Sequence, residues 1–106
     1  MTETNHYSEQ LLEDLLDLRL AAIHMRPYEI GHEVVVATIE RDLFALNVLR
    51  CVSRQHTSAA IKADNTVLAK GYYQIARLAD MEFRHIDTAN IGMPDPHGQP
   101  PTLLAA

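Results

Sequence analysis

The segment from His32 to Arg54 constrains the fold more than any other part of the chain, because its apolar residues fall on two sides of a helix. At about 100° per residue, one face carries Val35, Val36, Ile39, Leu43 and Leu46. The opposite face carries Val34, Ala37, Phe44, Val48 and Val52. Such a helix is either enclosed by its own fold or shared between a core and a partner. We expect one helix over 32–54, with its second face packed against another copy of the chain.

Two further helices are predicted on either side of this segment. Leucines spaced three and four apart predict a helix over 8–25, with Ser8 as its N-cap and its end set by Pro27. Pro27 and Gly31 then lie in a connection. The polar run Gln55–Ser58 reads as a turn, and an apolar stripe from Ile61 to Ile86 predicts a third helix over 58–88.

Three helices with short connections predict an all-α, up-down-up bundle as a single domain over residues 1–89. Residues 90–106 contain Pro94, Pro96, Pro100 and Pro101, which favours an irregular tail. Because three helices make a thin core, we expect homodimerisation to complete it. The predicted interface residues are Val34, Ala37, Phe44, Val48, Val52 and Tyr73.

Composition excludes several classes of protein. The 106 residues carry a net charge of −5, which argues against direct nucleic-acid binding. A single cysteine allows no internal disulfide framework and no Cys-rich metal site. The start of the chain is polar and acidic, unlike a secretory signal, and no apolar run approaches the roughly 20 residues of a membrane span. We therefore expect a cytoplasmic protein that does not enter membranes.

One group of polar residues suggests a metal site. If the second and third helices are antiparallel around a turn near His56, then His32 and the stretch Glu82–His85 lie at the same end of the bundle. Glu82 and His85 have the i, i+3 spacing of ferritin-like metal ligands, which this chain resembles over four residues. His24 or Glu33 would be a further ligand. The alternative is a partly solvated polar cluster without a metal, and we expect no cofactor.

Catalytic patterns are missing from the sequence. Cys51 lies within an apolar helical segment, which favours a packed thiol over a nucleophile. No serine lies in a Gly-x-Ser-x-Gly setting, and no Gly-rich phosphate loop is present. Tyr72 belongs to the core stripe, whereas Tyr73 points away from it and is available to a partner. We therefore do not expect an enzyme.

In size, acidity and three-helix layout, residues 8–88 resemble small bacterial antiactivators of quorum-sensing transcription regulators. This resemblance implies binding to a DNA-binding regulator, with its dimerisation or DNA binding blocked. The excess of apolar surface also favours a protein-binding role, and the negative charge favours a partner with a basic patch. The alternatives are a ferritin-like metal-binding protein and a small accessory subunit or chaperone of a larger enzyme.

Overall fold

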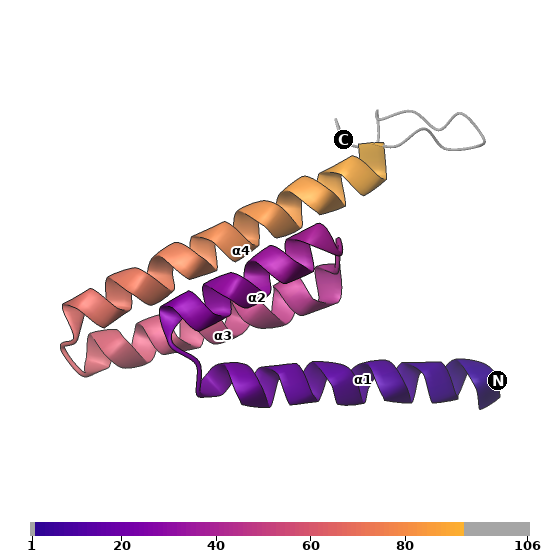
Figure 1. Ribbon diagram of the computed structural model, residues 1–106, viewed down its shortest axis with the longest axis horizontal. Coiled ribbons are helices and arrows are strands. Elements are labelled where there is room, and N and C mark those ends of the chain that lie inside the picture. The colour runs from indigo at the N-terminus through magenta and orange to yellow at the C-terminus, as the bar shows by residue number, and fades with distance from the viewer. Residues whose placement is uncertain (1, 93–106) are drawn as a thin grey trace.

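The computed structural model describes residues 2–92, and the side chains of residues 9–89. It contains the helices α1 (Thr2–Ile23), α2 (Pro27–Ile39), α3 (Leu43–Lys62) and α4 (Thr66–Gly92), shown in Figure 1. Residues 2–92 form no strand, so the predicted all-α class is confirmed. The predicted number of helices is wrong, because four helices are found where three were expected.

The segment 32–54 is not one helix, because the chain turns at residues 40–42. Arg41 has a φ of 55°, in the left-handed region. Asp42 then caps α3, its side chain accepting a hydrogen bond of 3.0 Å from the backbone N–H of Ala45. α2 also begins earlier than predicted, with Pro27 in its first turn, a position that proline tolerates well. The connection predicted at Pro27 and Gly31 is therefore part of α2.

The turn between α3 and α4 lies at residues 63–65 and not at Gln55–Ser58. Asp64 has a φ of 57°, and the Asn65 side chain accepts a hydrogen bond from the backbone of Leu68. Within the predicted turn, the Thr57 hydroxyl donates to the Ser53 carbonyl one helical turn earlier. This local hydrogen bond is compatible with a continuous helix, so the polar residues 55–58 do not form the predicted turn.

The core lies between α2, α3 and α4, which pack side by side (Figure 1). Two glycines allow α2 to approach α4 closely. A Cβ atom at Gly31 would lie 3.1 Å from the Cδ1 of Ile75, and one at Gly71 would lie 3.1 Å from the Cγ of Pro27. The buried residues of the core cluster are Ala22, Ile30, Val34, Ala37, Leu46, Leu49, Val52, Tyr72, Ala79 and Ile86.

The C-terminal part of α1 packs on α3, whereas the N-terminal part of α1 diverges from the other helices (Figure 1). Its end is held by two hydrogen bonds to backbone carbonyls. The Nε2 of His56 donates to the Ala22 carbonyl at 3.0 Å, and the Tyr72 hydroxyl donates to the Met25 carbonyl at 2.6 Å. The His56 and Tyr72 rings are stacked with centroids 4.2 Å apart. We call these four residues the latch.

The first and last helices have different bounds from those predicted. α1 includes Ser8, so this residue is not the N-cap, and the helix ends at Ile23, two residues before the predicted end. α4 continues to Gly92, past the predicted end at residue 88. The tail predicted at 90–106 lies, from residue 93 on, outside the described residues. No helix in the described part of the chain is long and apolar enough to cross a membrane.

Candidate functional site

Four charged side chains form a network between α3 and α4, with Asp80 at its centre. Arg50 donates from Nη1 to the Oδ1 of Asp80 at 2.7 Å, and Arg84 approaches the Oδ2 at 2.9 Å. Arg54 lies 3.5 Å from the same Oδ1 that Arg50 contacts. Arg50 also lies over the Phe83 ring, 4.0 Å from its centroid. One carboxylate thus serves three guanidinium groups, which leaves local positive charge.

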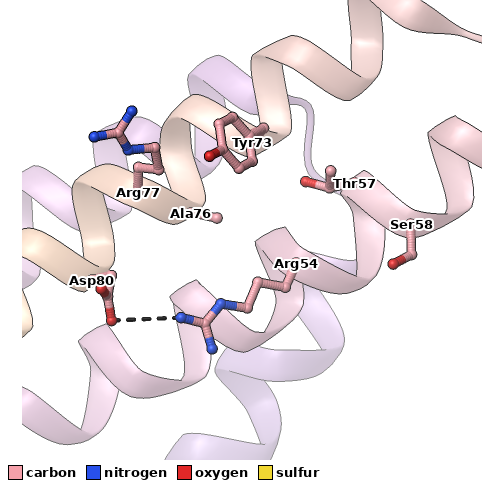
Figure 2. A pocket seen from close by; sticks show the side chains of 7 residues that line it. All are labelled: Arg54, Thr57, Ser58, Tyr73, Ala76, Arg77 and Asp80. Atoms are coloured by element: carbon pink, nitrogen blue, oxygen red, sulfur yellow. Dashed lines mark ion pairs between the residues drawn. The ribbon is translucent and has the colours of Figure 1, made fainter.

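A groove of about 380 Å³ lies beside this network (Figure 2). Arg54 points from α3 toward Asp80 on α4, and Tyr73 and Arg77 also come from α4. Asp80 is the only acidic residue that lines it. We call it the groove, and its lining residues are Arg54, Thr57, Ser58, Tyr73, Ala76, Arg77 and Asp80.

The groove continues into an apolar hollow toward the α3–α4 turn. This hollow shares Thr57 and Tyr73 with the groove and is also lined by Ile61, Ala69 and Lys70, with Thr66 at its end. Ile61 and Tyr73 are both more than half exposed. We call this second part the apolar extension. The surface between α3 and α4 therefore changes from basic near Asp80 to apolar near Thr66.

Charge is divided unequally along the chain. Residues 1–42 carry nine acidic and three basic side chains, whereas residues 43–92 carry six basic and four acidic ones. α3 contains no acidic residue. A protein with a net charge of −5 therefore presents a basic surface on its α3–α4 pair and an acidic one on α1 and α2.

α1 exposes a row of large apolar side chains. Leu12 is 65% exposed, Leu16 and Leu20 are about half exposed, and Ile23 is 41% exposed. Their spacing of four, four and three residues places them on one side of the helix. We call these four residues the α1 stripe. Acidic side chains accompany it, since residues 9–23 contain Glu9, Glu13, Asp14 and Asp17 against one basic residue, Arg19.

The structure corrects the predicted dimer face. Val34, Ala37 and Val52 are buried in the core of the single chain, with exposures of 3% or less, so they are not available to a partner. Val48 is partly buried against the same core. Phe44 and Tyr73 are both more than half exposed. The two faces of α2 are reversed, because Val35 and Ile39, assigned to the core, are exposed.

The structure also separates the predicted metal ligands. His32 and Glu33 border a hollow near Met25 at the start of α2, whereas Glu82 and His85 border another on α4. His24 lies in the turn after α1. Within the described residues, no three His, Cys, Asp or Glu side chains are grouped so that they could hold a metal ion. Two turns are the reason: the one at 40–42 puts His32 on a separate helix whose start lies beside residues 71–75 of α4, and the one at 63–65 shifts α4 along α3.

Two other features of the site differ from the sequence prediction. Cys51, expected to be packed in a core or interface, is exposed. The Asp80 network was missed, although its spacing contained a signal. Asp80 and Arg84 are four residues apart, as are Arg50 and Arg54, so each pair lies on one side of its helix.

Comparisons with known proteins found no match: no protein-family model, no curated protein and no solved structure is similar to this chain.

Proposed function

We propose that this protein acts by binding another protein, with the α1 stripe as the contact surface. The observation that carries the proposal is the exposure of Leu12, Leu16, Leu20 and Ile23 along one side of a helix. Exposed apolar surface of this kind is typical of interaction sites. Burying the remaining exposed area of each side chain would contribute about 1 kcal/mol, so the stripe can supply a substantial part of a micromolar affinity.

The acidic side chains of α1 indicate the kind of partner. Glu9, Glu13 and Asp17 would pair with basic groups at the rim of an apolar partner surface. DNA-binding transcription regulators are basic where they contact DNA. We propose that the partner is such a regulator in the cytoplasm, and that the complex blocks its dimerisation or its DNA binding, as the resemblance to antiactivators implies.

We also propose that the protein forms a homodimer, through contacts that differ from those predicted from the sequence. The buried Val34, Ala37 and Val52 are not part of the interface, whereas the exposed Phe44 and Tyr73 remain available to it.

Affinity capture with a matched pair of variants tests the proposed function. Leu16→Asp places a charge in the middle of the stripe, whereas Val67→Asp changes an equally apolar and 84% exposed residue at the start of α4. We expect the wild type and Val67→Asp to recover the same protein from lysate, and Leu16→Asp to recover much less of it. Calorimetry should then give a dissociation constant below about 10 μM.

The identity of the recovered protein decides the finer part of the proposal. If it binds DNA, the wild type should abolish its mobility-shift complex and Leu16→Asp should not. Recovery of an enzyme subunit would instead favour an accessory role. If no protein distinguishes the wild type from Leu16→Asp, the proposed function is wrong.

A further inference from the structure

The α1 stripe and the α3–α4 groove have complementary properties within one chain. α1 combines exposed leucines with four acidic side chains between residues 9 and 23. The groove and its apolar extension combine the exposed Tyr73 and Ile61 with basic side chains from both walls. Apolar surface on both sides, with opposite charge around it, is what a pair of docking surfaces needs.

The basic side chains of the groove have unused capacity for ion pairs. Arg54 is 59% exposed and reaches Asp80 only at 3.5 Å, on an oxygen that Arg50 already contacts at 2.7 Å. No ion pair involves Arg77 or Lys70 among the described residues, although both line this surface. Three cations along the surface can therefore pair with carboxylates from outside the chain.

The lengths of the two surfaces also agree. The stripe runs from Leu12 to Ile23, which at about 1.5 Å per residue is roughly 17 Å of helix. The α4 wall of the groove and extension runs from Thr66 to Asp80, or roughly 21 Å of helix on the same rise. The whole stripe therefore fits along this surface.

We propose that the α1 stripe of one molecule docks in the groove and apolar extension of a second copy, and that the exchange is reciprocal. Each copy then contributes one stripe and one groove, so the apolar area is buried twice, as a two-fold interface requires. The acidic Glu9, Glu13 and Asp17 lie near the N-terminal end of the α1 stripe and would meet the basic end of the groove. This charge pattern sets the direction, with α1 antiparallel to the α4 of the partner.

This inference uses the same stripe as the proposed function, so the dimer and the complex with another protein exclude each other. Variants of the groove distinguish the two proposals, because only the dimer uses the groove. A change in the groove should remove the dimer and leave the stripe free for the other protein, whereas a change in the stripe should remove both.

Charge reversal followed by mixing tests the dimer in the full-length chain. The groove variant combines Arg77→Glu in the groove with Lys70→Glu in the apolar extension, which leaves the Asp80 network intact. The α1 variant combines Glu13→Arg with Asp17→Arg. In the groove variant, the acidic residues beside the stripe face a groove that has become acidic. In the α1 variant, the residues beside the stripe have become basic and face a basic groove. Each variant alone should raise the dimer dissociation constant about 100-fold, because attractive pairs become repulsive ones.

An equimolar mixture of the two variants should restore the dimer. In the mixed pair, the acidic α1 of the groove variant meets the basic groove of the α1 variant. The basic α1 of the α1 variant meets the acidic groove of the groove variant. Sedimentation equilibrium from about 1 to 500 μM covers dissociation constants in the range expected for such an interface. Asp14→Arg is the control for net charge, and Leu16→Asp tests the apolar contribution. The Asp14→Arg variant should remain dimeric, and Leu16→Asp should be monomeric.

Several results would overturn the inference. They are a wild type that stays monomeric throughout this range, a groove or α1 variant that dimerises like the wild type, and a mixture of the two that remains monomeric. Dissociation by Asp14→Arg would also overturn it, since net charge would then explain the effect. Circular dichroism of each variant separates loss of pairing from loss of folding. A monomeric wild type that still recovers its protein partner through the stripe would leave the proposed function standing.

Discussion

Replacing Tyr72 by phenylalanine should lower the stability of the fold by removing one hydrogen bond of the latch. The Tyr72 hydroxyl donates to the Met25 carbonyl at 2.6 Å, and the residue is 5% exposed. Phenylalanine keeps the ring, so the stacking on His56 and the core contacts are retained. Losing one neutral hydrogen bond and leaving its acceptor without this donor costs about 1 to 2 kcal/mol.

The neighbouring Tyr73 provides the matched control. It is 54% exposed, so Tyr73→Phe should change the free energy of unfolding by less than about 0.5 kcal/mol. Urea denaturation near neutral pH, followed by circular dichroism, measures both variants. Equal losses for Tyr72→Phe and Tyr73→Phe, or no loss for Tyr72→Phe, would refute the role of the latch.

The pH dependence gives a second readout of the same hydroxyl. Burial raises the pKa of Tyr72, the negative charge of Glu29 adds to the rise, and the positive charge of Arg26 opposes it. The folded chain therefore holds this proton more tightly than the unfolded chain, whose tyrosine pKa is about 10. The resulting stability is fully present below about pH 10 and is lost as the pH rises through the folded pKa. The alkaline loss should be smaller in Tyr72→Phe than in the wild type.

Other substitutions test how α2 is positioned. Gly31→Ala should raise the free energy of unfolding by about 0.5 kcal/mol, because the gain in helix propensity exceeds the cost of moving the flexible end of Ile75. Gly71→Ala should lower it by about 1 kcal/mol, because the new Cβ would meet the rigid ring of Pro27. Asp42→Ala should cost about 1 kcal/mol through loss of the α3 cap, and Asp42→Asn should cost less. Urea denaturation measures all four variants.

The helical class could be predicted because apolar spacing survives errors in the position of turns. The stripe of α4 illustrates this, since Tyr72, Ala79 and Ile86 are all buried as their spacing predicted, whereas Ile61, the predicted start of the stripe, lies on α3 and is exposed. The same reasoning placed Tyr73 outside the core, and it is more than half exposed. Periodicity fixes which residues of one helix share a face and does not depend on where the neighbouring helices lie.

The turns could not be predicted by the same reasoning, because apolar spacing says little about short breaks. The charged run Glu40–Asp42 interrupts an otherwise helical pattern, and its Asp42 has the side chain of a good N-cap. Asp64 and Asn65 tolerate the left-handed backbone of a tight turn. Both signals are present in the sequence, but an apolar run on each side outweighed them.

An error in a turn has a larger effect on a predicted site than on a predicted fold. The antiparallel pairing of α3 and α4 depends on the position of their turn, so a shift of several residues changes every neighbour across the pair. Arg50 contacts Asp80 and Phe83, which places the stretch before His85 beside the first half of α3. The predicted convergence with His32 failed for this reason and because the turn at 40–42 places His32 on α2, beside Ile75, whereas the helical class is unaffected by either turn.

The latch and the α1 stripe lie on the same helix, but their roles in stability and binding are separable. The latch involves backbone carbonyls at and beyond the C-terminal end of α1, whereas Leu16 lies two turns earlier and is about half exposed. Tyr72→Phe should therefore lower the free energy of unfolding while leaving binding through the α1 stripe unchanged. Leu16→Asp should abolish binding with little change in the free energy of unfolding, because it replaces a partly solvated side chain. If Leu16→Asp instead unfolded the chain, α1 would be packed more tightly than its exposure indicates, and the stripe would be part of the core.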